Sequence, residues 1–239
     1  MDAESRRRLL LGTLALTAGA LSGRRALAAP TRIDERAASG FDAIEWHAIG
    51  ELVIEQAAAE RVRIEAEADV LPKILTEVRQ RCLVITLAPG RMQTQQPVRV
   101  HVGLRTLRTL RTFGSGSVRT GALRGDTLEL ELAAAGDVHI AELALRQLAL
   151  RMAGSGDVAI ARGQVDIQQL AIDGSGQYLA PLLASRRASV RIDGSGSAEI
   201  AVREALDADI GGSGEIGYRG RPALRERITG AGRVTHLGP

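Results

Sequence analysis

Two pairs of aspartates recur twenty residues apart in the second half of the chain. Asp137 is followed by Asp157, and Asp173 is followed by Asp193. Carboxylates stacked in this way could hold a calcium ion or serve as the acid and base of a polysaccharide-cleaving enzyme. They could also bond backbone amides at tight turns, as aspartate commonly does. We expect the turn role, with no catalytic residue and no metal site.

The other residue types that support catalysis or metal binding are sparse. His47, His101, His139 and His236 lie far apart without ligand spacing, so the sequence predicts no zinc site. Cys82 is the single cysteine, which excludes an intrachain disulfide, and it is interpreted as a small apolar core residue. The 239 residues include only five aromatic side chains, which argues against an aromatic-lined pocket or a base-stacking platform. We therefore expect no cofactor.

A short glycine motif, most often Gly-Ser-Gly, returns at fixed spacing through the second half of the chain. It begins at residues 114, 134, 154, 174, 194, 212 and 230, so its spacing is twenty residues four times and then eighteen residues twice. A fixed period in this range is the signature of a solenoid, in which each repeat packs on its neighbours.

The segments between the motifs alternate apolar and polar residues. Val138 and Ile140 follow one motif, and Leu148, Leu150 and Met152 precede the next. Alternation with a period of two indicates strands with one buried face, and no window shows sustained helical spacing. We therefore predict an all-β fold, a parallel β-helix or related β-solenoid, with coils of 18–20 residues and Gly-Ser-Gly corners.

The glycines of the motif are expected to form the corners of the coils. Glycine permits a positive φ and leaves no Cβ to collide with the corner stacked above it. We expect a positive φ in particular at Gly154, Gly174 and Gly194. The neighbouring residues exclude a phosphate loop, a Rossmann turn and a nucleophile elbow. The expected corner glycines are Gly114, Gly116, Gly154, Gly156, Gly174, Gly176, Gly194, Gly196, Gly212, Gly214, Gly230 and Gly232.

The preceding segment, residues 33–113, also looks strand-like but lacks the regular period. A short helical turn is expected from Asp69 through Val78, where a proline interrupts the alternation. Residues 104–112 repeat Leu-Arg-Thr three times. We interpret this repeat as the edge that leads into the regular coils, with its arginines exposed; an anion site is the alternative.

The first 28 residues resemble an export signal. Arg6 and Arg7 lie in a Ser-Arg-Arg-x-Leu-Leu sequence typical of twin-arginine signals, and an apolar stretch follows over residues 9–21. Cleavage is expected between Ala28 and Ala29. An ordinary secretory signal is the alternative. Since a spanning helix needs roughly 20 apolar residues, we expect no stable membrane span in the mature chain, which would be periplasmic or otherwise extracytoplasmic.

The net positive charge of the chain is confined to this signal. Residues 1–28 carry five arginines and two acidic residues, whereas the other 211 residues carry 26 basic and 26 acidic side chains. A protein that neutralises many phosphates needs a concentrated basic surface. The sequence therefore predicts no nucleic-acid partner.

Several segments together resemble the bacterial family described as putative auto-transporter adhesin, head GIN domain. The resemblance covers roughly residues 33–236 and implies a β-solenoid without catalytic residues. We therefore expect a signal at 1–28 followed by one domain at 33–236, with irregular strands over 33–113 and regular coils over 114–236. Besides the glycine motifs, the segments that carry the resemblance are residues 40–44, 53–56, 62–66, 71–85 and 216–222.

We predict an exported cell-envelope protein that is not an enzyme. Its solenoid would act as an interaction, scaffold or adhesin-like surface for an unidentified envelope protein or glycan. One alternative is a polysaccharide-active β-helix enzyme. Another is a self-assembling scaffold, a homo-oligomer formed through the ends or edges of the solenoid, because an uncapped end exposes strand edges.

Overall fold

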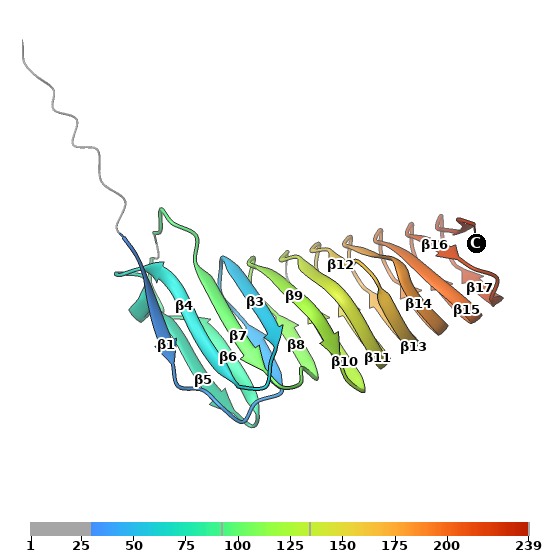
Figure 1. The fold of residues 1–239 in the computed structure, drawn as a ribbon. Coiled ribbons are helices and arrows are strands. Elements are labelled where there is room, and N and C mark those ends of the chain that lie inside the picture. Colours follow the sequence, from blue (N-terminus) through green and yellow to red (C-terminus); the bar gives the residue numbers. More distant parts are fainter. Residues whose placement is uncertain (1–29, 92, 134, 239) are drawn as a thin grey trace, which may run out of the picture.

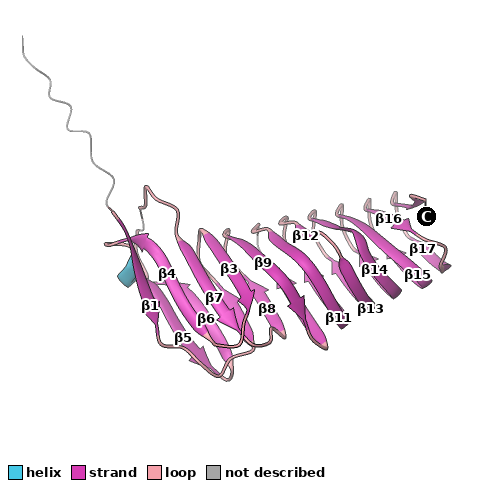
Figure 2. Cartoon of the chain, in the orientation of Figure 1, coloured by secondary structure: helices cyan, strands magenta, loops and turns pink. Residues whose placement is uncertain are grey.

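The computed structural model describes residues 30–91, 93–133 and 135–238. The regular secondary structure of the described chain is nearly all strand, wound into one elongated body (Figures 1 and 2). Its elements are β1 (Thr31–Arg36), β2 (Ala43–Trp46), β3 (Glu51–Gln56), β4 (Arg61–Glu67), the 3-10 helix η1 (Leu71–Lys73), β5 (Ile74–Arg79), β6 (Cys82–Leu87), β7 (Arg99–Leu104), β8 (Thr109–Thr112), β9 (Ser117–Arg124), β10 (Thr127–Leu132), β11 (Val138–Met152), β12 (Val158–Ile160), β13 (Gly163–Ile172), β14 (Gln177–Ile192), β15 (Ser197–Ile210), β16 (Glu215–Arg219), β17 (Ala223–Ile228) and β18 (Arg233–His236).

Each coil crosses the molecule twice and so contributes to two faces. Face 1 contains β2, β8, β10, β17, most of β13 and the second halves of β11, β14 and β15. Face 2 contains β3, β9, β12, β16, β18 and the first halves of β11, β14 and β15. Neighbouring strands of the coils are parallel and pair in register, so that Leu130 lies beside Leu150 and Leu150 beside Leu170. The predicted β-solenoid is confirmed.

The core consists of columns of apolar side chains that point into the solenoid. Because side chains alternate between the two sides of a strand and successive coils keep the same register, one inward position repeats from coil to coil. One such column on face 1 is almost fully shielded from solvent and contains Leu132, Met152, Ile172, Ile192 and Ile210.

The order of the first strands in space differs from their order in the chain. β2 lies between β6 and β8, and β3 lies between β7 and β9, so β2 and β3 form a coil of the solenoid. β4 to β7 are added outside this coil, with antiparallel pairs β1–β4, β4–β7 and β5–β6. The sequence did not predict this insertion.

The expected helical turn through Val78 is wrong. Only Leu71–Lys73 is helical, and β5 begins at Ile74. Ile74 is completely buried, and β5 pairs along its whole length with β6. The pairing with β6 therefore outweighs the local preference for a turn after Pro72.

The change from 20-residue to 18-residue coils is located between β14 and β15. Ala180 pairs with Ile200, but Ala184 pairs with Ala201, so residues 181–183 have no partner in β15 and form a bulge in which Leu182 is exposed and Leu183 is buried. Between Ser185 and Arg187 the extra residue lies on β15 instead, because one residue of β14 there opposes two residues of β15. The solenoid narrows at this step.

Candidate functional site

Of the two reasons that we expected for glycine at the corners, the close approach of stacked backbones is confirmed and the positive φ is not. Gly174 and Gly194 do not have a positive φ, so that prediction is wrong. A Cβ on Gly174 would lie 2.1 Å from the carbonyl oxygen of Gly154, and one on Gly194 would lie 2.3 Å from that of Gly174. The amides of Ser195 and Gly196 donate to the Gly174 oxygen at 3.2 and 3.1 Å, which draws the two corners together. The spacing of stacked backbones thus excludes a side chain here.

The other described glycines of the motif share this crowding. A Cβ on Gly114 would meet the oxygen of Ala48 at 2.2 Å, so the corner of the β2–β3 coil lies below the first Gly-Ser-Gly corner. Gly230 does have a positive φ, of 138°. The second glycine of most motifs is buried against a neighbouring coil, as at Gly116, Gly156, Gly176, Gly196 and Gly214, while Gly232 is half-buried.

The stacked aspartates are engaged within the chain. Asp137 accepts a hydrogen bond from the amide of Asp157 at 3.0 Å, and Asp157 accepts one from the amide of Gln177 at 2.8 Å. The expected turn role is therefore confirmed for this pair. Asp173 and Asp193 instead form ion pairs with Arg151 at 3.0 Å and Arg191 at 2.7 Å. Within the described residues, no three side chains among His, Cys, Asp and Glu form a metal-binding group.

The histidines and the cysteine have separate surroundings. His47 stacks on Phe113 with ring centroids 4.6 Å apart, His101 lies 3.7 Å from Glu65, and His236 contacts the Gly220 oxygen at 2.9 Å. His139 is exposed in β11. Cys82 is half-buried at the start of β6 rather than in the core, and its partial burial raises the pKa of its thiol.

The arginines of the Leu-Arg-Thr repeat are also paired. Arg105 donates to the Ala58 carbonyl at 3.1 Å, Arg108 lies 3.4 Å from Asp42, and Arg111 lies 3.0 Å from Glu45. Two of the three guanidinium groups are thus matched by carboxylates. This geometry disfavours an anion site. The interpretation of the repeat as an edge is wrong as well, because β8 pairs with β2 on one side and with β10 on the other.

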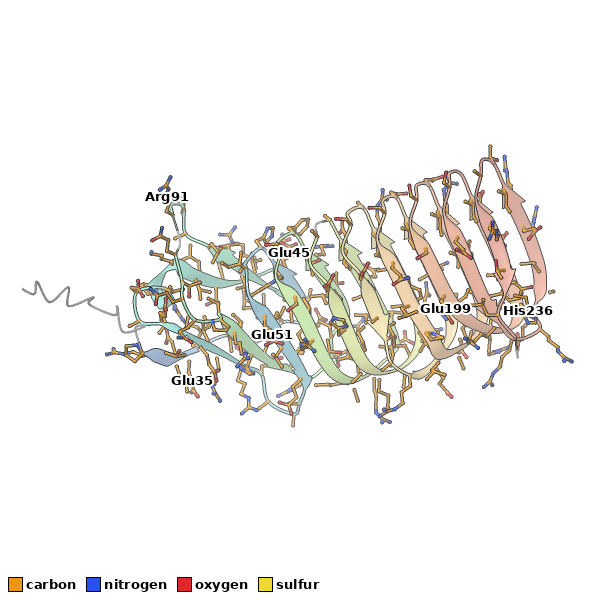
Figure 3. All side chains as sticks on the ribbon, turned by 90° about the horizontal axis from the view of Figure 1, so that it is seen from above. Glu35, Glu45, Glu51, Arg91, Glu199 and His236 are labelled. Carbon is orange, nitrogen blue, oxygen red and sulfur yellow. The ribbon has the colours of Figure 1, made fainter. Side chains whose placement is uncertain are left out.

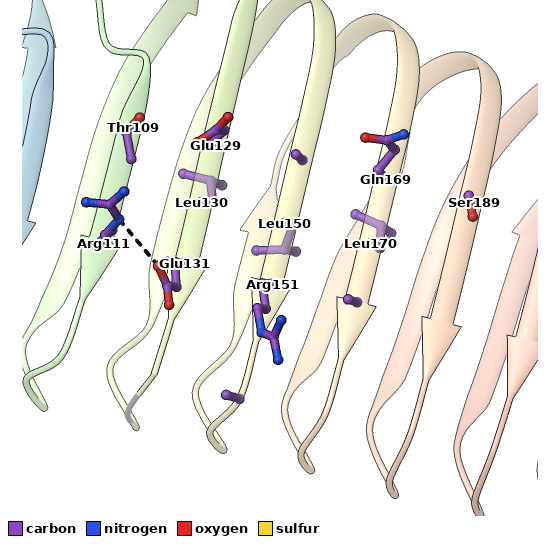
Figure 4. Close-up of a pocket in the computed structure, with 13 residues that line it drawn as sticks. Thr109, Arg111, Glu129, Leu130, Glu131, Leu150, Arg151, Gln169, Leu170 and Ser189 are labelled. Carbon is purple, nitrogen blue, oxygen red and sulfur yellow. Dashed lines mark ion pairs between the residues drawn. The ribbon is translucent and has the colours of Figure 1, made fainter.

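An open groove of about 810 Å³ runs across the outer surface of face 1 (Figure 4). It crosses five neighbouring passes of the chain, β8, β10 and parts of β11, β13 and β14. Two rows of outward side chains form its surface, because every second residue of each strand points outward. The first row is Thr109, Glu129, Ala149, Gln169 and Ser189; the second is Arg111, Glu131, Arg151 and Ala171.

The second row is a ladder of alternating charge. Arg111 lies between Glu45, at 3.0 Å, and Glu131, at 3.4 Å. Arg151 follows in the next coil, and Ala171 then interrupts the alternation. Small residues at Ala149 and Ala171 hollow the surface between these charged groups. The groove therefore offers donors and acceptors at regular spacing to a ligand that lies across the strands.

The groove has few properties of a catalytic cleft. Its two carboxylates, Glu129 and Glu131, lie two residues apart on β10 and face the same way. Glu129 is exposed, and Glu131 is ion-paired with Arg111. The general acid of a glycosidase needs an apolar setting that is shielded from water. The sequence analysis missed this groove, although the 20-residue spacing of Arg111, Glu131 and Arg151 could have indicated it.

The comparison with protein families matches residues 40–222 to the model described as putative auto-transporter adhesin, head GIN domain. The chain belongs to the head GIN domain family. The match covers most of the chain and includes every strand from β2 to β16.

Solved structures share the fold of this head GIN protein. A putative adhesin from Bacteroides fragilis is similar with a TM-score of 0.81 and 21% identity, covering 87% of this chain and 97% of that one. A putative adhesin from Parabacteroides distasonis has a TM-score of 0.71 and 19% identity, covering 87% and 98%. A putative lipid binding protein from the same organism has a TM-score of 0.70 and 24% identity, covering 87% and 96%.

Two further comparisons give negative results. No curated protein matches the chain. Across the residues that the structure describes, no helical segment has the length and apolar character needed to cross a membrane. Arg6, Arg7, Ala28 and Ala29, the residues of the expected export signal, lie outside the described residues.

Proposed function

We propose that this protein is an exported, adhesin-like binding protein that uses the groove on face 1 to hold an extended polar ligand of the cell envelope. Membership of an adhesin family supports a surface or extracytoplasmic role without catalysis. The fold suits this role because a solenoid presents the same surface position repeatedly along its axis.

The observation that carries the proposal is the pair of outward rows in the groove. The second row alternates in charge from Arg111 through Glu131 to Arg151 and the first row is mostly polar, while Ala149 and Ala171 leave room between these side chains. A polymer that carries both charged groups and hydroxyl or amide groups could contact several rungs at once. Many weak contacts of this type add up to useful affinity when they act together.

A pull-down tests the proposal. Purified protein is immobilised and exposed to envelope extract that has been treated with protease, with periodate to oxidise glycans, or with neither. We expect an envelope component to be retained and then released unchanged, and the treatment that abolishes capture identifies it as protein or glycan. Capture that persists when the substitution Ala149→Trp fills the groove would contradict the proposal. Cleavage of the captured component would contradict it as well.

Export through the twin-arginine route is part of the proposal. Recognition of such a signal depends on the arginine pair, so the double variant Arg6→Lys/Arg7→Lys is expected to remain in the cytoplasm. Fractionation of cells followed by immunoblotting measures this. Normal export of the double variant would show that the general secretory route is used instead.

A further inference from the structure

The two ends of the solenoid present free strand edges to solvent. Within the described residues, β5 pairs only with β6 and β1 only with β4, while β17 pairs only with β15 and β18 only with β16. β1 and β5 lie at one end of the molecule and β17 and β18 at the other (Figure 1). Glu35 of β1 and His236 of β18 mark these ends in a second view (Figure 3).

We propose that copies of this chain stack head to tail, with β17 of one copy pairing antiparallel with β5 of the next. The strand directions fit this junction. β5 runs antiparallel to β6, whereas β6, β2, β8 and the later strands of face 1 are all parallel to one another. When two copies are stacked in the same orientation, face 1 therefore continues from β17 into β5 as an antiparallel pair.

The inward side chains match in one register. β17 and β5 both have six residues, and their inward positions are Leu224, Glu226 and Ile228 on β17 and Ile74, Thr76 and Val78 on β5. Full overlap places Leu224 opposite Val78, Ile228 opposite Ile74, and Glu226 opposite the hydroxyl of Thr76. Leu224 and Ile228 are each 40% exposed in the single chain, and this pairing would cover them.

The outward side chains match in the same register. Arg225 falls opposite Glu77, and opposite charges that face each other across strands favour pairing. Arg225 forms no ion pair in the described part of its own chain, whereas Glu77 contacts only Arg79 of its own strand. A shift by two residues in one direction puts Arg225 opposite Arg79, and a shift in the other puts Glu226 opposite Ile74. Full overlap is therefore the favoured register.

A closed dimer through β17 is disfavoured by charge. When β17 of one copy pairs antiparallel with β17 of another in the register centred on Glu226, Arg225 lies opposite Arg227 and Glu226 lies opposite its own copy. In the register centred on Arg225, Arg225 lies opposite its own copy. Like charges directly opposite each other are destabilising. A junction between two different ends does not close after two copies, so it generates an open chain of subunits.

Charge exchange tests this assembly directly. Sedimentation velocity over a range of concentrations is expected to show a mass that rises to several times that of the monomer. Arg225→Glu and Glu77→Arg should each return the protein to the monomer, and the double variant should assemble again. Glu55→Arg, a change at an exposed glutamate of β3, is the control and should assemble normally. Far-UV circular dichroism checks that each variant is folded.

Disulfide trapping detects the junction even if assembly is weak. In a Cys82→Ser background, a Glu77→Cys protein mixed with an Arg225→Cys protein should cross-link at least tenfold more than with a Leu182→Cys protein, whose exposed side chain lies on β14, an interior strand that is paired on both sides. Equal cross-linking in both mixtures would overturn the proposal. A wild-type protein that stays monomeric and shows no selective cross-link would overturn it as well.

Discussion

Replacing Gly174 by alanine is expected to lower the free energy of unfolding by about 3 kcal/mol, the upper part of the range for overpacked sites. The new Cβ would lie 2.1 Å from the Gly154 carbonyl oxygen, a distance that real atoms do not reach. Relief requires the corner at Gly174 to move away from the corner at Gly154 and toward the corner at Gly194, which would disturb the hydrogen bonds that Ser195 and Gly196 donate to the Gly174 oxygen. Urea unfolding measures the change.

The matched control is Gly121→Ala in β9. A Cβ at Gly121 has no heavy atom within 4 Å, and its φ is not positive. Since alanine restricts the unfolded chain more than glycine does, this variant should be unchanged or more stable by up to about 1 kcal/mol. If Gly174→Ala and Gly121→Ala have equal stability, the corners are not held at the spacing described above.

Replacing Tyr178 by phenylalanine is expected to destabilise the protein by about 1–3 kcal/mol. Tyr178 and Gln168 are both completely buried, and the Tyr178 hydroxyl donates to Gln168 Oε1 at 2.8 Å. Burial raises the pKa of Tyr178, so the hydroxyl keeps its proton and remains a donor. Removing it leaves the amide of Gln168 without a partner, because its Nε2 already has none in the described structure.

The double variant Gln168→Leu/Tyr178→Phe provides the contrast. Gln168 occupies an inward position where the two preceding coils have Leu128 and Leu148. Replacing both polar partners by apolar groups of similar size is close to neutral, so the double variant should lie within about 1 kcal/mol of the wild type. If the double variant loses as much free energy of unfolding as Gln168→Leu and Tyr178→Phe lose together, the two side chains contribute through packing alone.

The sequence predicted the solenoid well because its determinants are local and repeated. The glycine motif marks each corner, and alternating residues such as Leu148, Leu150 and Met152 mark each inward face. The sequence also indicated that stacked corners leave no room for a Cβ, but it could not give the distance at which the corners of Gly154 and Gly174 approach each other. That distance is a property of the stack and not of any single coil.

The insertion of β2 and β3 could not be predicted for a different reason. The corner at residues 47–50 carries no Gly-Ser-Gly motif, yet Ala48 lies directly beneath Gly114. The strands that pair with β2, β6 and β8, are distant from it in the chain, and pairing at long range leaves no local signal in the sequence. The groove could be predicted only in part. Its charged row repeats with the period of the coils, but only the strand register shows that Arg111 and Glu131 share one outer face.

The central claim is that the groove on face 1 is the binding surface, and a titration of the captured envelope component tests it most directly. Ala149→Trp fills the groove, while Ala122→Trp places the same side chain on an exposed position of β9 outside it. Affinity is measured by isothermal calorimetry for the wild type and both variants. We expect Ala149→Trp to weaken binding at least tenfold and Ala122→Trp to leave it unchanged. Equal affinity in all three proteins would place the binding surface elsewhere on the solenoid.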